Sequence, residues 1–590
     1  MFFQMNTTTH DCAVRGGAEN KDASRPAIIW TLGLVLFAVF LLFFNAGDTA
    51  LFEPDEGRNA EVAREILLLE DWVTPHYNFV PRMDKPIFFY WLVAFSYKLF
   101  GVSEWSARLP SVLSALGTLV LIFLFASRFL GGWQALWATL ILLTSVGFFG
   151  LSRIVISDMT LTFLLTFGLL SFCWAERSVC VNKRRVVYLL GYGAFGAATL
   201  VKGVIGIVLP GMVILSYILF TRNRFVLRRM DLPLGIIVFL TVVVPWYVLA
   251  EARNPGYLRY FLVEEHLLRF STSHFQRTEP WYFFIPVLIF GFFPWTGLLP
   301  AIMRGLRKQT QNQQTLFLLL WTAVPFVFFS LSASKLPHYI LPILPPLSII
   351  VGAFVAESLP KAANAKSSLW LPPLGMTVLL GVIVGIIGYP YLLPQSAQQI
   401  IQVAFPKLPL AHLLGWVLLI SLTGAMIKRL LWPRQGSLYL LNCGSFVLLV
   451  LFAEPVVQAV ADSRSSKELA AKSAPLRPSE ARVAIYEAYL ASLPFYLKVD
   501  QPIMVISSPT KHRIMGSRYV AEKKPERADG DKRVLFTHEE FRTLWMQSTQ
   551  PLFVFVQAND MSRFAEERLI CAVQVLQVED VALFRNGPCS

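Results

Sequence analysis

The sequence has few charged residues and few cysteines. Only 15% of its 590 residues are charged, whereas 55% are hydrophobic and the mean hydropathy is +0.54. This balance excludes an ordinary soluble globular protein. The six cysteines show no CxxC spacing, which argues against a zinc site. The net charge of +14 could indicate nucleic-acid binding, but the basic residues lie in short loops between apolar runs, which is the pattern of membrane topology.

Apolar runs of about 20 residues, the length that spans a bilayer as a helix, recur along the chain. The first run, 27–46, lacks the small-residue cleavage site of a signal peptide, so we expect it to be retained. It follows a polar tail, residues 1–26. The sequence therefore predicts a polytopic α-helical membrane protein with about thirteen transmembrane helices. The predicted spans are 27–46, 107–127, 131–150, 157–176, 186–201, 203–220, 232–250, 281–303, 314–331, 338–357, 369–390, 410–427 and 436–453.

The segment Ile87 to Phe100 decides the orientation of the chain. It is apolar but short and contains Lys98, so we predict an interfacial or re-entrant helix rather than a span. This choice places the arginine-rich clusters, such as 222–229, on the inside, as the positive-inside tendency requires. The N-terminus is then cytoplasmic and the C-terminal region lies outside.

Residues 454–590 are charged and contain no spanning run, so they are expected to form a small external α/β domain. Val483 to Tyr486, Ile503 to Ile506 and Leu552 to Val556 are predicted strands, while Glu487 to Leu493 and His538 to Met546 are predicted helices. The domain has no Gly-rich phosphate loop, GxSxG or HExxH motif. A lid or docking module is therefore expected rather than a catalytic domain.

With this topology, acidic and basic residues gather at the outer lip of the membrane. Charge beside hydrocarbon is costly and indicates function. Each cluster of charged residues taken alone could be an ordinary solvated loop. Solvated loops do not explain why the clusters all lie on the outer side of the membrane. We therefore infer one outward-facing cavity that holds charges of both signs. Its candidate residues are Asp55, Glu56, Arg58, Asp84, Lys85, Arg153, Asp158, Lys202, Glu264, Glu265, His266, Arg269, Lys335, His338 and Tyr339.

These residue types suit chemistry on a phosphorylated lipid. An exposed aspartate can act as a general base towards a hydroxyl nucleophile. Lysines and arginines can hold a phosphate or diester leaving group and neutralise its developing charge. A divalent metal ion is an open alternative, held by Asp55 with Glu56 or by Asp84 with His266. A membrane lipid carrying a phosphate and a sugar would fit such a cavity.

Several motifs occur in the order expected of one enzyme family. Phe52 to Arg58, Asp71 to Pro75 and Asp84-Lys85-Pro86 resemble the first external loop of the protein O-mannosyltransferase superfamily, and within it the bacterial 4-amino-4-deoxy-L-arabinose lipid A transferases. Arg108 to Ser111 and Ser334 to Tyr339 also resemble that family, and the likeness covers about residues 28–350.

The resemblance implies a GT-C fold with thirteen spans and an external α/β tail. It also implies a sugar donor carried on polyprenyl phosphate, with no nucleotide cofactor. Asp55 matches the family's catalytic acidic position and Asp158 its second acidic position. Lys85 matches the lysine thought to meet the donor phosphate, and Lys202 and Tyr339 match further cavity positions.

Asp84 departs from the family pattern. The arabinose transferases usually have Glu-Lys-Pro where this chain has Asp84-Lys85-Pro86. One methylene fewer moves the carboxylate by about 1.5 Å, which is enough to disturb a sugar or metal contact. The resemblance therefore predicts the class of mechanism more firmly than the sugar.

Together with the topology, the resemblance implies a bacterial inner-membrane glycosyltransferase with its C-terminal domain in the periplasm. Its expected partners are a polyprenyl-phosphate-linked sugar, a lipid A or other lipid, glycan or protein acceptor, and membrane lipids, with no nucleic acid. Asp55, Asp158 and Glu56 are expected to be catalytic, and Arg58, Lys85, Arg153, Lys202, Lys335 and Tyr339 to bind substrate. A transporter or flippase of lipid-linked glycans is the alternative, although no inverted repeat is evident. A structural membrane subunit is a third hypothesis. Its charged residues would be scattered over the chain, whereas here they gather at one side of the membrane.

Overall fold

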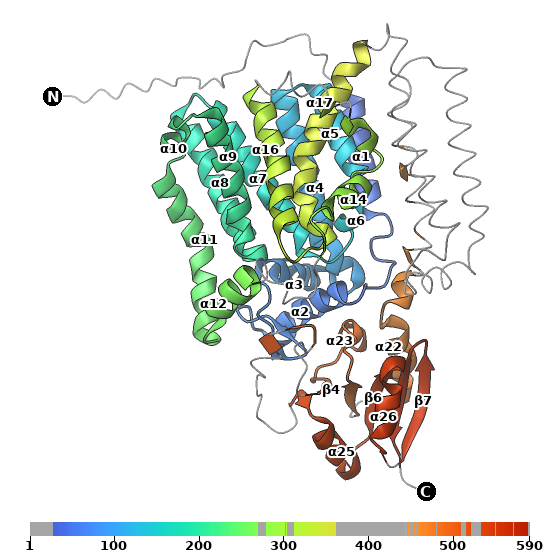
Figure 1. Cartoon of the computed structure of the whole chain (residues 1–590). Coiled ribbons are helices and arrows are strands. Elements are labelled where there is room, and N and C mark those ends of the chain that lie inside the picture. Colours follow the sequence, from blue (N-terminus) through green and yellow to red (C-terminus); the bar gives the residue numbers. More distant parts are fainter. Residues whose placement is uncertain are drawn as a thin grey trace, which may run out of the picture.

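The computed structural model has two parts, a bundle of helices and a C-terminal α/β domain below it (Figure 1). The parts of the chain that it describes are 28–268, 279–300, 302–303, 312–361, single positions between 443 and 460, 461–478, 481–508, 515–517, 519–520, 533–548, 550–569 and 571–587. The predicted spans 369–390 and 410–427, most of 436–453, and the polar tail lie outside these residues.

The helical part follows the order of the apolar runs. Its elements are α1 (Ile28–Phe43), α2 (Asp55–Leu69), α3 (Phe88–Phe100), α4 (Glu104–Phe129), α5 (Gly132–Leu143), α6 (Val146–Ser152), α7 (Ser157–Arg177), α8 (Val181–Lys202), α9 (Ile205–Thr221), α10 (Phe225–Arg229), α11 (Leu232–Arg253), α12 (Tyr257–Arg259), the π-helix η1 (Tyr260–Leu268), α14 (Phe284–Gly291), the 3₁₀-helix η3 (Thr296–Leu298), α16 (Gln313–Leu331), the 3₁₀-helix η4 (Pro337–Ile343) and α17 (Leu344–Lys361). A two-stranded hairpin, β1 (His76–Tyr77) and β2 (Val80–Pro81), follows α2.

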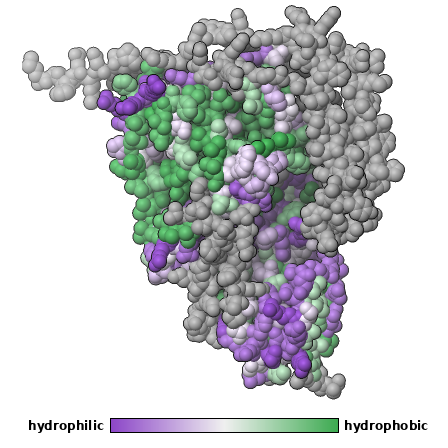
Figure 2. Space-filling model, viewed as in Figure 1, coloured by the Kyte–Doolittle hydropathy of each residue, from purple (hydrophilic) through white to green (hydrophobic). Residues whose placement is uncertain are grey.

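Within the described residues, five helices are long and apolar enough to cross a membrane: α4, α7, α11, α16 and the continuous helix Pro337–Ser358. A sixth span would combine α5 and α6, which are bent by 65°. α1 and α9 are shorter apolar helices. Figure 2 shows hydrophobic residues over the helical part and hydrophilic residues over the C-terminal domain, which agrees with a membrane-embedded bundle.

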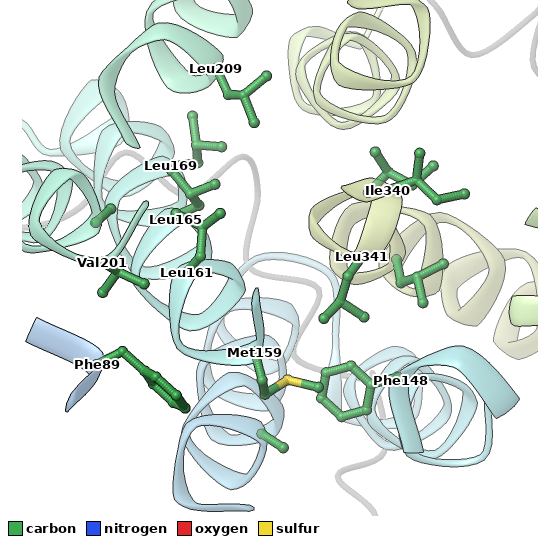
Figure 3. Packing of buried hydrophobic residues seen from close by; sticks show 14 of the residues in the cluster. Phe89, Phe148, Met159, Leu161, Leu165, Leu169, Val201, Leu209, Ile340 and Leu341 are labelled. Carbon is green, nitrogen blue, oxygen red and sulfur yellow. The ribbon is translucent and has the colours of Figure 1, made fainter. Parts of the chain in front are cut away.

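The helices pack through small residues and interlocking aliphatic side chains. Figure 3 shows Met159, Leu161, Leu165 and Leu169 along α7 facing side chains from α8, α9 and η4. A Cβ added at Gly168 would lie 2.3 Å from the Phe195 ring, so only glycine permits this approach of α7 to α8. The packing therefore fixes where α7 and α8 end, and both ends contribute to the site.

α2 and α3 lie at the lower end of the bundle, between it and the C-terminal domain (Figure 1). α3 has 13 residues, so it is about 20 Å long and too short for a hydrocarbon core of about 30 Å. Its length agrees with the prediction that Ile87 to Phe100 does not cross the membrane. A capping box at Ser103 and Ser106 then begins α4.

The C-terminal domain has a six-stranded sheet of order β5-β4-β3-β6-β8-β7. Its strands are β3 (Arg482–Tyr486), β4 (Met504–Ile506), β5 (Leu535–Phe536), β6 (Leu552–Gln557), β7 (Ala572–Val578) and β8 (Val581–Asn586). Strands β5, β4, β3 and β6 pair in parallel, whereas β8 pairs antiparallel with both β6 and β7. The helices are α22 (Lys467–Ser473), α23 (Leu493–Leu497), α25 (His538–Gln547) and α26 (Met561–Glu566), with the 3₁₀ turns η7 (Ala474–Leu476) and η9 (Ala558–Asp560).

The domain's three predicted strands and the helix from His538 are confirmed. The predicted helix Glu487 to Leu493 is wrong. Glu487 has a φ of 60°, a left-handed conformation that turns the chain directly after β3. Its N–H donates to the Ile506 carbonyl, and the helix α23 begins only at Leu493.

The C-terminal domain is joined to the first loop of the helical part by buried hydrogen bonds. Asn78 donates to the Ile503 carbonyl over 2.7 Å and accepts from the Ile503 N–H over 2.8 Å. The Tyr77 hydroxyl donates to the Ala491 carbonyl over 2.9 Å. Both side chains are almost fully buried. The two parts of the molecule therefore share one interface around β1, β2 and α2.

Candidate active site

A cavity opens where the membrane helices meet α2 and the loop before α3. α7 begins, α8 and α16 end, and η4 begins at this same place. Its polar and charged lining brings together residues from six separate segments of the chain. They include Asp55, Asp84, Lys85, Asp158, Lys202, Glu265, His266, His338 and Tyr339.

Asp55 is the first residue of α2, and 49% of its side chain is exposed. Its carboxylate accepts a hydrogen bond from the Arg58 guanidinium over 2.5 Å, one turn along the helix. Burial raises the pKa of the Asp55 carboxyl, but the charges of Arg58 and Lys85 outweigh it and hold the pKa well below its usual value. The helix N-terminus also favours the anion. Asp55 is therefore a permanent carboxylate facing the cavity.

Lys85 lies in the loop before α3 and lines the same cavity. Among the described residues, no group forms a hydrogen bond or ion pair with its ammonium. Burial lowers the pKa of Lys85 to about 8, and the repulsion of Lys202 and Arg58 adds to this, whereas Asp55 and Asp158 oppose it. The lysine thus presents an ammonium that lacks a direct partner, which is the state expected of a group that receives an anion.

The buried Asp158 at the start of α7 forms an ion pair with the partly buried Lys202 at the end of α8. His338, from η4, lies with its Nε2 3.8 Å from the second oxygen of Asp158. The ring of Tyr339 lies 4.7 Å from the Lys202 ammonium, a cation–π contact. Lys202 is therefore held between a carboxylate and an aromatic face, in contrast to Lys85.

The π-helix η1 brings Glu265 and His266 to the cavity. Such helices are rare and occur often at functional sites. The His266 Nδ1 lies 2.7 Å from the Phe261 carbonyl and its Nε2 3.4 Å from the Lys202 carbonyl. Gly203 makes this contact possible, because it has a φ of 71° and a Cβ there would lie 2.5 Å from Nε2.

Asp84 is held by three side chains. One carboxylate oxygen pairs with the Arg82 guanidinium over 2.7 Å. The other accepts from the Ser517 hydroxyl over 2.8 Å and the Tyr260 hydroxyl over 3.1 Å.

These contacts occupy the atoms that would have to hold a metal ion. Both Asp84 oxygens are engaged, and both ring nitrogens of His266 lie beside carbonyl oxygens. In the described part of the chain, no three His, Cys, Asp or Glu side chains form a metal-binding group. The predicted pair Asp84 and His266 does not fit a cation in this arrangement, and we derive no step through one.

Besides Arg58, three predicted site residues do not line the cavity. Glu56 is buried and accepts from Arg108 Nε and Nη2 over 3.0 and 2.9 Å. Arg153 pairs with Glu454 over 3.2 Å at the end of α6. Lys335 donates to the carbonyls of Glu279 and Ser332. Each satisfies a buried partner instead of facing the cavity, and Glu56 is corrected from a catalytic to a structural position.

Arg58 touches the site through Asp55, and Arg269 lies outside the described residues. Glu265 and His338 were predicted among the cavity residues without an assigned role, and both line the cavity. Sequence reasoning missed Ser517, which contacts Asp84. No sequence signal marks Ser517, because it comes from the other domain.

Known proteins are similar to this chain in both sequence and fold. Residues 84–248 match the dolichyl-phosphate-mannose-protein mannosyltransferase family. The undecaprenyl phosphate-alpha-4-amino-4-deoxy-L-arabinose arabinosyl transferase of Aeromonas hydrophila is 32% identical over 345 residues, which cover 57% of this chain and 62% of that enzyme. A protein from Pseudomonas fluorescens with the same enzyme name, numbered 1, is 31% identical over 430 residues, which cover 72% of this chain and 75% of that enzyme.

The fold is similar to a solved relative over almost its whole length. The crystal structure of ArnT from Cupriavidus metallidurans bound to undecaprenyl phosphate matches with a TM-score of 0.80 at 27% identity, covering 95% of this chain and 99% of ArnT. The fold is thus of the GT-C class. The chain belongs to the undecaprenyl phosphate-alpha-4-amino-4-deoxy-L-arabinose arabinosyl transferase family of membrane glycosyltransferases.

Proposed function

We propose that this chain transfers a sugar from undecaprenyl phosphate to an acceptor at the outer face of the bacterial inner membrane. One observation carries the proposal. Lys85 presents to the cavity an ammonium that has no hydrogen-bond or ion-pair partner in the part of the chain that the structure describes, and the same cavity holds the Asp55 carboxylate. The relative bound to undecaprenyl phosphate supports a phosphate of this kind as the anion that Lys85 receives.

The proposed reaction breaks the bond between the anomeric carbon and the phosphate oxygen and forms a bond from that carbon to the acceptor oxygen. Undecaprenyl phosphate leaves with the electron pair, and the ammonium of Lys85 stabilises its charge. Asp55 accepts the proton when the nucleophile is a hydroxyl. When the nucleophile is a lipid A phosphate, which is already ionised, Asp55 positions the sugar instead. Asp158 orients Lys202, and Arg58 orients Asp55.

The sugar that we propose is 4-amino-4-deoxy-L-arabinose, and the acceptor is lipid A. The names of the relatives support the sugar. The short side chain of Asp84 bears most on the identity of the sugar. Its carboxylate is held beside the cavity by Arg82, Tyr260 and Ser517. Mass spectrometry of lipid A and of surface glycans, from cells with and without the gene, would identify both substrates. Unchanged lipid A with an altered glycan would redirect the proposal to another acceptor.

The proposed topology has a cytoplasmic tail (1–26), a GT-C domain with thirteen spans (27–453) and a periplasmic domain (454–590). Its support is the basic loop pattern and the short helix α3. Reporter fusions after Arg185, Gln309 and Lys361 are expected to give cytoplasmic signal, and a fusion after Pro455 a periplasmic one. A reversed signal at any of these sites contradicts the thirteen-span topology.

Asp55→Asn tests the catalytic assignment. The amide cannot accept a proton, so we expect turnover to fall about 10² to 10⁴-fold while expression and membrane insertion stay unchanged. Asp48→Asn is the matched control, because Asp48 is an exposed carboxylate in the same loop that does not line the cavity. The assay is transfer from the purified lipid-linked sugar in proteoliposomes. Near-normal turnover of Asp55→Asn removes Asp55 from the mechanism.

A further inference from the structure

A short stretch of the C-terminal domain is packed into the helical part of the molecule. Met515, Tyr519 and Val520 are buried in the same hydrophobic cluster as the membrane helices, and not in either of the two clusters around the C-terminal sheet. The ring of Tyr519 lies 5.1 Å from that of Tyr260, at the start of η1. This stretch therefore belongs structurally to the site, although it lies more than 400 residues after Asp84 in the chain.

Its polar contacts reach Asp84 directly. The Ser517 hydroxyl donates to Asp84 Oδ1 over 2.8 Å, and the Ser517 side chain is fully buried. The Met515 carbonyl accepts from Arg82 Nη1 over 3.2 Å, while Arg82 Nη2 holds the other Asp84 oxygen over 2.7 Å. Both oxygens of Asp84 thus depend on groups that this stretch contributes or fixes.

Its backbone also touches the partner of Asp55. Gly516 has a φ of 71°, and a Cβ at this position would lie 2.4 Å from Arg58 Nη1. The guanidinium of Arg58 therefore lies directly against the glycine backbone. The same guanidinium donates through Nη2 to Asp55. Gly516 is the close-approach residue that lets Arg58 occupy this place.

From these contacts we infer that the C-terminal domain completes the donor site, with Ser517 and Gly516 as positioning residues that act through Asp84 and through Arg58. The inference rests on the proposed function for what the site binds. It assigns the domain a direct part in the geometry of the reaction, beyond covering the cavity. A domain that only docks would bury the same apolar residues without placing a hydroxyl on a cavity carboxylate.

A double-mutant cycle tests Ser517. We expect Ser517→Ala to lower kcat/KM for the lipid-linked sugar about 10-fold, the scale of one hydrogen bond to a charged group. In an Asp84→Asn background the same substitution is expected to cost less than about 2-fold, since its partner is already changed. Ser473→Ala is the control, because Ser473 is a buried serine of the same domain whose hydroxyl donates only to a nearby backbone carbonyl. Equal losses in both backgrounds, or no loss in the wild-type background, overturn the inference.

Gly516→Ala tests the contact with Arg58. We expect kcat to fall about 10-fold or more, because the methyl group displaces the guanidinium that orients Asp55. Gly101→Ala carries a similar backbone penalty, since Gly101 has a φ of 79°, but a Cβ there meets nothing within 4 Å. A loss of thermal stability equal in both variants, with kcat unchanged in both, assigns Gly516 a purely structural role and overturns its part of the inference.

A binding measurement separates this inference from the proposed function. Wild-type turnover of the lipid-linked sugar tests the proposed function alone. Thermal stabilisation of the full chain by undecaprenyl phosphate needs no turnover, and we expect it to be smaller in Ser517→Ala and Gly516→Ala than in their controls. Stabilisation equal to that of the controls contradicts a role of the C-terminal domain in the donor site, whatever the wild-type turnover is.

Discussion

The pH dependence of donor use follows from the environment of Lys85. Burial lowers its pKa from 10.5 to about 8. The free enzyme then holds a charged lysine in about nine molecules of ten near pH 7, and in about one of ten near pH 9. If the ammonium receives the donor phosphate, kcat/KM for the lipid-linked sugar falls about 10-fold across this interval, because kcat/KM reports the ionisation of the free enzyme.

Lys85→Arg provides the decisive comparison. A guanidinium stays charged throughout this range, so its profile should be flat above pH 7 even if its absolute rate is lower. Lys98→Ala is the control for loss of a lysine at the same interface, because Lys98 is exposed on α3 and outside the cavity. The assay is initial transfer rate against donor concentration in proteoliposomes. An unchanged alkaline decline in Lys85→Arg, or a flat wild-type profile, would refute the role of Lys85.

Unfolding would not explain the expected decline. A base whose pKa is lower in the folded state binds fewer protons there than in the unfolded chain between about pH 8 and pH 10.5. The contribution of Lys85 to stability therefore increases as the pH rises through this window. As the pH rises, kcat/KM is expected to fall while the contribution of Lys85 to stability increases. A parallel measurement of thermal stability therefore distinguishes loss of the lysine charge from unfolding.

Three further predictions concern residues whose expected roles the structure changes or leaves open. Arg108→Ala should destabilise the protein by about 3–5 kcal/mol, because it leaves the Glu56 carboxylate buried without its partner, and thermal denaturation in detergent measures this loss. Glu56→Gln should retain far more turnover than Asp55→Asn, and an equal loss with unchanged stability would restore Glu56 to the mechanism. Chelation with EDTA should leave the rate within about 2-fold, since hydrogen bonds and ion pairs already occupy Asp84 and His266. A rate that EDTA abolishes and a divalent cation restores would show that these side chains rearrange around a metal.

Much of the site was predictable because membrane topology places residues by a simple rule. Once each loop is assigned to one side of the membrane, the helix ends that meet at the outer face are known. Asp158 at the start of α7 and Lys202 at the end of α8 follow from this rule alone. Lys202 lies at the turn between two helices, since α9 begins only three residues later.

The directions of side chains at that face were not predictable. Asp55 and Glu56 are adjacent in the sequence, and successive residues of a helix point about 100° apart. One therefore faces the cavity, and the other faces Arg108 and the interior. Arg153 and Lys335 lie at the correct end of their helices but satisfy buried acceptors there. The sequence pattern predicts the charge of a residue and the end of the helix at which it lies. The group that its side chain contacts depends on tertiary packing.

The placement of α2 has a consequence for how the enzyme is made. This helix is polar, yet Glu61 and Glu65 are fully buried, and Arg64 donates to the Val499 carbonyl, 435 residues away. During synthesis the helix leaves the ribosome long before the residues that cover it. Contacts of such large sequence separation form slowly, because a long loop must close first. A nascent chain that ends before Val499 lacks the acceptor of the Arg64 guanidinium. If the C-terminal domain completes the donor site as we propose, the site reaches its final geometry only after the last quarter of the protein has been synthesised and folded. We therefore expect the new enzyme to be inactive while it is being inserted.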